Sequence, residues 1–395
     1  MNRYVMIDGL RGIGALSIAL YHIFRYGPLP EAASQVMPAL AEDAISRGWM
    51  AVQWFFVIAG LASGLATKDR LPTWSETPRH VARRVIRLGP VYWVSVTLTA
   101  ILTIVAIHGW GDRSLNDSTP TLWQFTAHLG FVHDLLGFEA LTTGIWFVAV
   151  ILQIDLVFIF LLALAKWVDG ARDGGGDSGS SNGEIRDAAG QSSRPSSTAS
   201  QSPRTFTLIV CFGPLTLWSL FFSLADSATE TWFHHFFCLY MLGALLGWRM
   251  AGRAGERLLW AYFALMGLQL VRHYSLELLN AMVAGLAIYL AWRARRLQTW
   301  LKQPVWQYFG RISYSLFMIH YPISWLVGRW GHSLTGDHPW AALAWLLAGL
   351  GLSIGAAHLL YIGIERPAVD WARGLGRAPA APATTTASTT SEATA

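Results

Sequence analysis

The sequence predicts an all-α protein, a polytopic membrane helix bundle with about ten transmembrane helices. Only 13% of the 395 residues are charged, against roughly 25% in an ordinary soluble domain. The apolar residues form long blocks close to the about 20 residues that a membrane-spanning helix needs. The basic residues gather between these blocks, as topology signals do. The net charge of +5 therefore indicates orientation in a membrane, and no nucleic-acid partner is expected.

Ten apolar blocks are long enough to cross the hydrocarbon core of a bilayer. They lie near residues 5–26, 50–67, 88–108, 145–166, 206–225, 233–249, 258–273, 276–292, 312–330 and 340–363.

The charges of the connecting segments predict the orientation of these ten helices. The segment 31–47 is acidic on balance, whereas Lys68 to Arg87 carries one lysine and five arginines. Cytoplasmic loops carry an excess of basic residues. Every basic segment lies on the cytoplasmic side if both termini are cytoplasmic, so we expect that topology in a bacterial inner (plasma) membrane.

The domain organisation follows from where the polar segments interrupt the blocks. The segment rich in Gly, Ser and Asp is too polar to form a packed core and is expected to be a disordered cytoplasmic linker. The tail of Ala, Pro, Thr and Ser is expected to be disordered as well. The divisions are residues 1–167 (helices 1–4, with an outer interfacial segment at 109–144), 168–205 (linker), 206–377 (helices 5–10) and 378–395 (tail).

The two cysteines, Cys211 and Cys238, both lie inside apolar blocks. Neither a disulfide framework nor a cysteine-rich metal site is therefore expected. No metal-ligand spacing, phosphate-binding glycine loop or nucleophile elbow appears in the sequence. We expect a site without a metal.

Asp8, Arg11 and His22 lie in the first block, where lipid makes polar and charged side chains costly. At about 100° per residue, Arg11 and His22 differ by about 20° beyond three full turns, so they share one helix face about 16 Å apart. Asp8 lies three residues before Arg11 and can pair with it. This pattern is typical of a helix that lines an enclosed path through the membrane.

Two less specific interpretations of this block stay open. In the first interpretation, Asp8 and Arg11 form an ion pair that sets the topology, and His22 lies at the membrane interface. In the other, the block is a signal peptide with a basic front region. An acidic residue such as Asp8 is unusual in such a region.

This block resembles the start of the acyltransferase family 3 membrane enzymes, whose first helix carries an aspartate, then an arginine, ten residues and a histidine. Further similar segments follow in order along the chain. They are Ala51 to Gly60 (AVQWFFVIAG, with Gln53 and Ala59 where the family usually has an acid and a serine), Arg83 to Trp93 (RRVIRLGPVYW), Gly310 to Pro322 (GRISYSLFMIHYP) and Glu365-Arg366-Pro367.

One departure from the family pattern concerns a carboxylate. The stretch that begins at Trp146 usually continues to a glutamate five residues later, and here that position is Ile151. Asp155 lies one turn further, about 40° round the helix and about 6 Å deeper. Two alternatives stay open: Asp155 replaces the glutamate, or it pairs with a buried donor.

The resemblance implies transfer of an acyl group, commonly acetyl in this family, from acetyl-CoA or another acyl-CoA to an extracytoplasmic carbohydrate. Arg83, Arg84 and Arg87 lie at the inner boundary, where guanidinium groups suit the donor's phosphates. Simple positive-inside anchoring is the alternative for them. Arg11 is expected to orient the donor.

Two histidines are candidates for the chemistry at the other end of the path. His22 suits general-base removal of the acceptor's hydroxyl proton, or transient acylation. His320, in the ninth block, is expected to line the site or to form a structural hydrogen bond, and a direct catalytic role is the less favoured alternative. Trp146 and Trp123 are candidates for stacking on a sugar.

The sequence therefore predicts a membrane O-acyltransferase in which His22, Arg11, Asp8, Asp155 and His320 form the catalytic site. The chain either completes the transfer or hands the acyl group to a separate extracytoplasmic transferase. The rival functions are a membrane transporter that uses the polar stripe as a substrate or proton path, and an assembly scaffold.

Overall fold

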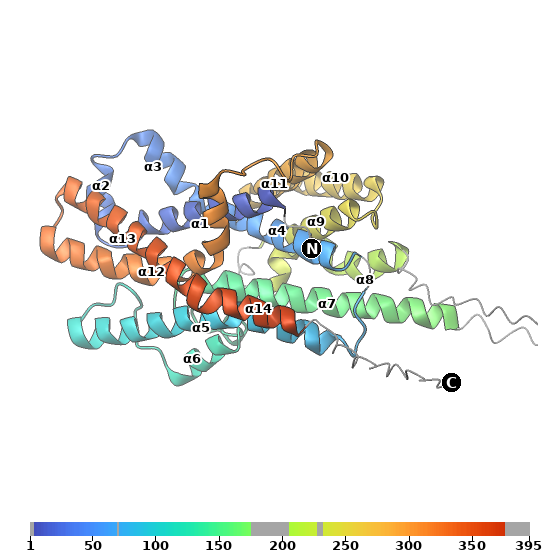
Figure 1. Ribbon diagram of the computed structural model, residues 1–395, viewed down its shortest axis with the longest axis horizontal. Helices are drawn as coiled ribbons and strands as arrows, with labels where there is room; N and C mark the ends of the chain where they lie inside the picture. The colour runs from blue at the N-terminus through green and yellow to red at the C-terminus, as the bar shows by residue number, and fades with distance from the viewer. Residues whose placement is uncertain (1–3, 69–70, 175–204, 227–231, 376–395) are drawn as a thin grey trace, which may run out of the picture.

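The computed structural model describes residues 4–68, 71–174, 205–226 and 232–375. Within these ranges the chain is helical and contains no strand, which confirms the all-α class (Figure 1). The predicted tail and the greater part of the predicted linker lie outside the described residues. The helices are α1 (Val5–Ile23), α2 (Leu29–Ser34), α3 (Ala39–Ser46), α4 (Ala51–Ala66), α5 (Thr77–Trp110), α6 (Leu122–Leu129), α7 (Ile145–Gly174), α8 (Thr205–Trp218), α9 (Phe233–Met250), α10 (Glu256–Arg272), α11 (Leu276–Arg293), α12 (Pro304–Thr335), α13 (Pro339–Leu360) and α14 (Arg366–Gly374), with the short turns η1 (Gly48–Met50), η2 (Asp134–Leu136), η3 (Ser219–Ser223) and η5 (Tyr361–Glu365).

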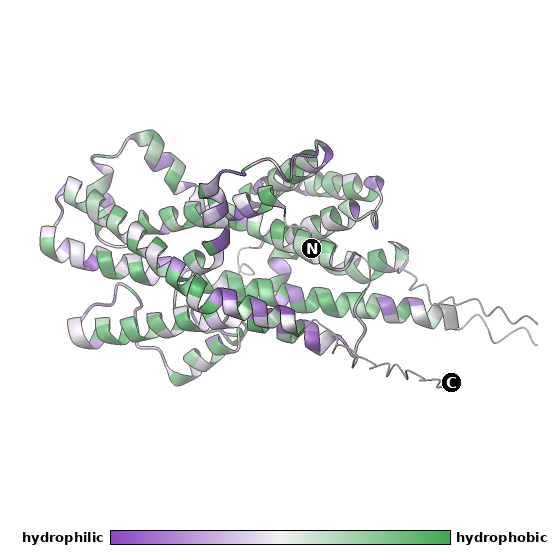
Figure 2. Cartoon of the chain, in the orientation of Figure 1, coloured by the Kyte–Doolittle hydropathy of each residue, from purple (hydrophilic) through white to green (hydrophobic). Residues whose placement is uncertain are grey.

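Each of the ten predicted blocks lies on a helix of the structure. By length and composition, six segments of the described chain can cross a membrane, and Figure 2 shows hydrophobic residues along most of their length. The other four blocks form α1, α9, α10 and α12. The six segments are Ala39–Ala66, Thr77–Trp110, Ile145–Ala171, Thr205–Ser223, Leu276–Arg293 and Pro339–Gly374.

Three helices extend further than the apolar blocks predicted. α5 begins at Thr77, so the arginines from Arg79 to Arg87 lie on its first turns and not in a loop. α12 begins at Pro304, and α7 continues to Gly174, past residue 168 where the linker was expected to begin. Hydropathy marks only the apolar part of a helix, while backbone hydrogen bonds continue through polar residues of good helix propensity.

Glycines set two close helix crossings in the bundle. A methyl group on Gly12 of α1 would lie 2.6 Å from the backbone nitrogen of Gly310 on α12. A methyl group on Gly243 of α9 would lie 1.9 Å from the carbonyl oxygen of Val57 on α4, and one on Gly60 would lie 1.9 Å from that of Tyr240. Small residues allow backbones to approach closely and so favour helix packing in membranes.

The α4–α9 crossing gives a stability prediction. Gly243→Ala is expected to destabilise the protein by about 1–3 kcal/mol, because the methyl group meets backbone that cannot move independently. Gly267→Ala in α10 is the matched control, since no heavy atom lies within 4 Å of its new methyl group. Thermal unfolding in detergent measures the stability of both variants. Equal unfolding midpoints would contradict the close approach of α4 and α9.

Candidate functional site

α1 and α12 bring two histidines together from distant parts of the chain. The Nδ1 atom of His22 lies 2.8 Å from the Nε2 atom of His320. The two rings are nearly parallel, with an angle of 6° between their planes and 5.1 Å between their centres. Thr143 adds its hydroxyl oxygen at 3.4 Å from the same Nδ1 atom. His320 is fully buried, so this pair forms a fixed element inside the bundle.

The partners of the two rings assign their protons. The Nδ1 atom of His320 lies 3.0 Å from the carbonyl oxygen of Leu316, and a carbonyl only accepts, so this nitrogen carries the proton. In a neutral imidazole the other nitrogen then accepts. The Nδ1 atom of His22 must therefore donate to His320. This leaves the Nε2 atom of His22 with a lone pair, as a general base requires.

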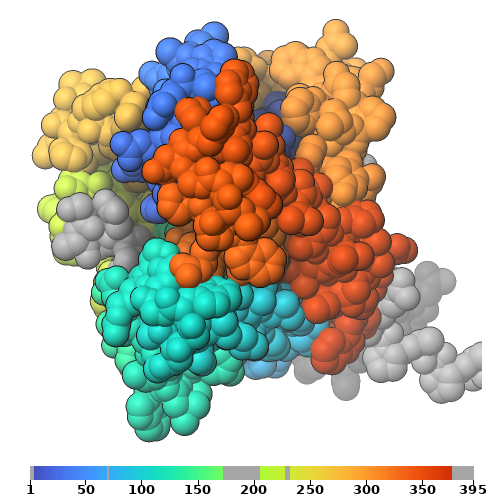
Figure 3. Space-filling model, turned by 90° about the vertical axis from the view of Figure 1, so that its left-hand side faces the viewer, coloured from blue at the N-terminus to red at the C-terminus, as the bar shows by residue number. Residues whose placement is uncertain are grey.

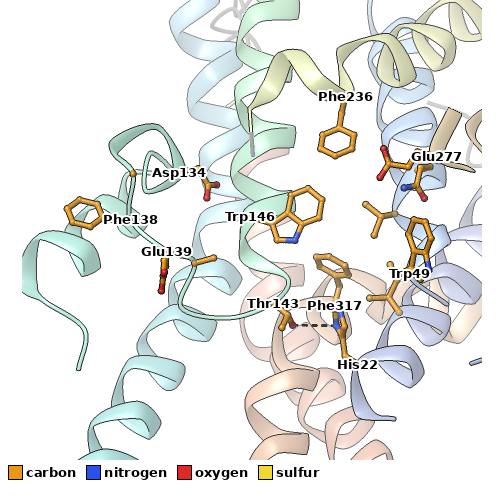
Figure 4. Close-up of a pocket in the computed structure, with 15 residues that line it drawn as sticks. His22, Trp49, Asp134, Phe138, Glu139, Thr143, Trp146, Phe236, Glu277 and Phe317 are labelled. Atoms are coloured by element: carbon orange, nitrogen blue, oxygen red, sulfur yellow. Dashed lines mark hydrogen bonds between the residues drawn. The ribbon is translucent and has the colours of Figure 1, made fainter. Parts of the chain in front are cut away.

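His22 lines a cavity of about 610 Å³, which we call the histidine pocket (Figure 4). Helices and turns from both halves of the chain form its wall, with aromatic rings on several sides. The end of the molecule that Figure 3 shows is built from α2, α3, α6 and the adjoining ends of α5, α12 and α13. The lining residues are Ile18, His22, Trp49, Val52, Gln53, Asp134, Gly137, Phe138, Glu139, Ala140, Thr143, Trp146, Phe236, Glu277 and Phe317.

Arg11 lines a second cavity, of about 160 Å³, which we call the arginine pocket. Three arginines and two carboxylates contribute to its wall. The lining residues are Arg11, Phe55, Ile58, Ala59, Ala62, Arg84, Arg87, Leu88, Phe147, Ile151, Asp155, Ser313, Tyr314, Phe317 and Glu365. The two pockets thus lie at successive levels of α1, as the spacing of Arg11 and His22 predicts.

Phe317 lies between the two pockets and contributes to the wall of each. Its ring centre lies 6.1 Å from that of Phe55 and 5.3 Å from that of Phe147. It also lies 6.3 Å from the ring of His320. This aromatic cluster therefore belongs to the wall that the two pockets share.

Arg11 contacts α12 as well as its own helix. Its Nη2 atom donates to the Oγ atom of Ser313 over 3.1 Å, and its Nη1 atom lies 3.9 Å from a carboxylate oxygen of Asp8. The structure therefore contains the pair that the spacing of Asp8 and Arg11 predicts. Asp8 itself does not line either pocket.

Asp155 is held by three donors inside the bundle. Its Oδ1 atom lies 3.1 Å from Arg84, 3.3 Å from Ser63 and 2.5 Å from the hydroxyl of Tyr240. Only 2% of the residue is exposed. Of the two alternatives drawn from the sequence, this geometry favours a carboxylate paired with buried donors. Ile151, at the family's glutamate position, lines the same pocket.

Glu365 is a carboxylate of the arginine pocket that the sequence analysis did not select. It accepts hydrogen bonds from the backbone nitrogen of Ser315 over 3.2 Å and from its hydroxyl over 2.6 Å. It shares the pocket wall with Arg11 and Arg87. One sequence feature could have pointed to Glu365. It is the acidic residue of the Glu365-Arg366-Pro367 motif, which follows the last apolar block.

The three arginines of α5 that the sequence analysis selected, Arg83, Arg84 and Arg87, differ in their surroundings. Arg84 is engaged by Asp155 and also donates to Ser63. Arg87 is exposed in the pocket wall, and no hydrogen bond or ion pair is found for it within the described part of the chain. Arg83 does not line either pocket. Arg87 is therefore the member of this cluster best placed to meet an anionic group.

Other residues singled out in the sequence have different positions. Trp146 lines the histidine pocket, whereas Trp123 is 77% exposed on α6 and lines neither pocket. A further helix histidine, His358 of α13, lies 3.3 Å from the hydroxyl of Tyr308 and lines neither cavity. In the described ranges, no group of three or more His, Cys, Asp or Glu residues is arranged to hold a metal ion.

A second histidine pair lies between α6 and η2, beside the histidine pocket. The rings of His128 and His133 stack with their centres 4.0 Å apart, and both are fully buried. Burial, with a smaller effect of His128, lowers the pKa of His133 to about 3. Burial raises the pKa of the adjacent Asp134 to about 6.

These shifts predict opposite pH effects on the stability of this segment. The pKa of His133 is below 6.5 in the folded state, so its contribution is present above pH 6.5 and is lost as the pH falls. The pKa of Asp134 is above 3.8, so its contribution is present at low pH and is lost as the pH rises through about 6. Asp134 therefore offsets part of the acid sensitivity that His133 causes.

We expect Asp134→Asn to lose more local stability than the unmodified chain when the pH falls from 7 to 5. Hydrogen exchange of residues 122–141, corrected for the intrinsic rate at each pH, measures this difference. His133→Gln is expected to reduce the acid sensitivity. If the exchange rates of the unmodified chain and of Asp134→Asn depended on pH in the same way, Asp134 would not offset the acid sensitivity that His133 causes.

Comparison with known proteins identifies one family. A family model described as an acyltransferase domain matches residues 4–362, nearly the whole chain. No curated protein and no solved structure matches the chain. The matched range includes every residue that lines the two pockets except Glu365.

Proposed function

The chain belongs to this acyltransferase family, and we propose that it moves an acyl group, most simply acetyl, from acyl-CoA to a hydroxyl group of an extracytoplasmic carbohydrate. The observation that carries the proposal is the pair of pockets, one lined by arginines and one by a histidine with a free nitrogen, with Phe317 in the wall of both. Donor and acceptor would enter from opposite ends and meet near this residue.

The arginine pocket supports an anionic donor. Arg87 and Arg11 provide guanidinium groups that suit phosphate and polarise a carbonyl oxygen. We expect both termini to be cytoplasmic, and α1 then runs from Arg11 near the cytoplasm to His22 near the outer surface. The donor pocket would thus face the compartment that contains acyl-CoA.

The histidine pocket supports activation of a hydroxyl group. The Nε2 atom of His22 takes the hydroxyl proton while the oxygen forms a bond to the thioester carbonyl carbon. The carbon–sulfur bond then breaks, and the imidazolium returns its proton to the leaving thiolate. In the alternative order, Nε2 attacks the carbonyl carbon, the carbon–sulfur bond breaks, and the imidazole carries the acyl group. The hydroxyl oxygen then bonds to the acyl carbon and the carbon–nitrogen bond breaks. The released imidazole takes the hydroxyl proton and passes it to the thiolate.

Proteoliposomes loaded with an oligosaccharide and supplied outside with acetyl-CoA labelled in the acetyl group test this proposal. The expected result is label in the oligosaccharide, released by mild base as acetate. Flux of a solute without thioester cleavage would instead support a transporter. Full glycan acylation in cells that carry His22→Ala would favour a scaffold. A product that forms only after addition of outer-surface proteins would indicate a separate transferase.

Arg87→Gln is expected to raise the KM for acetyl-CoA about 10- to 100-fold, because a charge-assisted hydrogen bond contributes about 1.5–3 kcal/mol. Arg83→Gln is the matched control on the same helix, since its side chain does not line the pocket. Initial rates over a range of donor concentrations measure both variants. Equal KM values would remove Arg87 from the donor site.

A further inference from the structure

The charges on the wall of the histidine pocket are all of one sign. Asp134, Glu139 and Glu277 contribute carboxylates, and no lysine or arginine of the described chain lines this cavity. The arginine pocket differs, because three guanidinium groups accompany its two carboxylates. A bound molecule in the histidine pocket therefore meets a negative potential that nearby cations of the wall do not cancel.

Asp134 is the most enclosed of the three carboxylates. Its side chain is only 6% exposed, and its Oδ2 atom accepts no hydrogen bond within the described part of the chain. The Nε2 atom of His133 lies 3.3 Å away, and that ring is neutral near pH 7, because burial lowers its pKa to about 3. Among the described residues, the carboxylate therefore lacks a compensating cation.

The other two carboxylates lie in more open parts of the same wall. Glu277 lies in the first turn of α11, and its side chain is 28% exposed, with its Oε2 atom 3.6 Å from the Nε2 atom of His235. Glu139 is exposed where the chain leads from η2 to α7. Figure 4 shows Glu277 on the side of Trp49 and Phe236, and Asp134 with Glu139 on the opposite side of the cavity. Negative charge thus lies on two sides of the cavity that His22 lines.

Aromatic rings complete this environment. Trp49, Trp146 and Phe236 line the cavity, and Trp146 lies 5.6 Å from Phe236 between ring centres. The faces of aromatic side chains pack against the apolar faces of a sugar ring, and their quadrupoles attract cations. Carboxylates accept hydrogen bonds from hydroxyl and ammonium groups but repel other anions.

We propose that the histidine pocket selects acceptor sugars by charge, and binds amino sugars best, neutral sugars less well, and sugars with a carboxylate or phosphate near the reacting hydroxyl least. This inference rests on the proposed function, because it takes the pocket to be the acceptor site. It specifies the substrate class of that site: a neutral or cationic glycan and not an acidic one.

Three photoreactive glycosides that differ only at carbon 6 test the proposal. They are a glucoside, a 6-amino-6-deoxyglucoside and a glucuronide, each with the same diazirine group on the aglycone. The full chain in lipid nanodiscs is irradiated with each at pH 7, and the labelled peptides are identified by mass spectrometry. We expect labelling in the segments 134–146 and 277–280, with the glucuronide at least about tenfold weaker than the amino sugar.

Charge-neutralised variants then separate electrostatics from shape. In the combined variant Asp134→Asn, Glu139→Gln and Glu277→Gln, the three glycosides are expected to label within about twofold of one another. Glu31→Gln is the matched control, since this exposed carboxylate of α2 lies outside the cavity. Added salt is expected to reduce the discrimination in the unmodified chain.

Glucuronide labelling as strong as that of the amino sugar would overturn this inference, and so would an unchanged labelling ratio in the combined variant. Labelling confined to other segments would overturn it as well. The experiment uses no acyl donor, so its outcome is distinct from that of the transfer assay. Charge-selective labelling without acyl transfer to any glycan would refute the proposed function alone.

Discussion

Replacing His22 with glutamine is expected to lower the rate of acyl transfer by about 10²- to 10⁴-fold, the range that a general acid–base catalyst contributes. Glutamine keeps a similar volume and can donate to His320, but it offers no basic nitrogen. Transfer of labelled acetyl from acetyl-CoA to an oligosaccharide in proteoliposomes measures the loss. The KM for the donor is expected to change little, because His22 does not line the arginine pocket.

Controls separate loss of the base from loss of the fold. His358→Gln removes another helix histidine that lines neither pocket, and it is expected to keep nearly full activity. His320→Gln is expected to lower kcat less than His22→Gln does, with KM unchanged, because it disturbs the partner that fixes the proton of His22. Full activity of His22→Gln would refute the mechanism in both of its forms.

Hydropathy predicted the positions of the helices well, for a physical reason. Backbone polar groups in lipid must be satisfied within the segment, so a long apolar block has few alternatives to a helix. The ends were less predictable, because α5 and α7 continue into residues that hydropathy treats as loop or linker. The arginines of α5 therefore lie on a helix, where the three-residue spacing of Arg84 and Arg87 places both side chains at the pocket.

The site was predictable only where one helix determines it. The angle between Arg11 and His22 on α1 follows from the helical repeat, and both side chains contact α12 in the structure. The partners of these residues come from segments about 300 residues away in the chain. No pattern within one sequence specifies which helices pack together, so the hydrogen bond from His22 to His320 could not be derived.

The same limit applies to the carboxylates of the two pockets. Glu365 reaches the arginine pocket because the end of the last long helix packs beside Ser315. Asp134 and Glu277 meet around the histidine pocket although 143 positions separate them. Charges on separate elements combine into one electrostatic environment only after folding.

The second large effect is expected for the buried ion pair of Arg84 and Asp155. Arg84→Gln is expected to lower the free energy of unfolding by about 3–5 kcal/mol, because it leaves a buried carboxylate without a cation. Asp155 is 2% exposed, so water cannot readily replace the guanidinium group. Denaturant or thermal unfolding in detergent measures the change, with the amount of folded protein as a second readout.

A double variant distinguishes this structural role from donor binding. Arg84→Gln combined with Asp155→Asn removes both charges, and it is expected to recover much of the lost stability, since Tyr240 and Ser63 can still bond to the amide oxygen. Arg87→Gln should instead leave stability unchanged and raise the donor KM, because Arg87 has no such partner within the described chain. If Arg84→Gln were as stable as the unmodified chain but bound acetyl-CoA weakly, Arg84 would belong to the donor site and Asp155 would not depend on it.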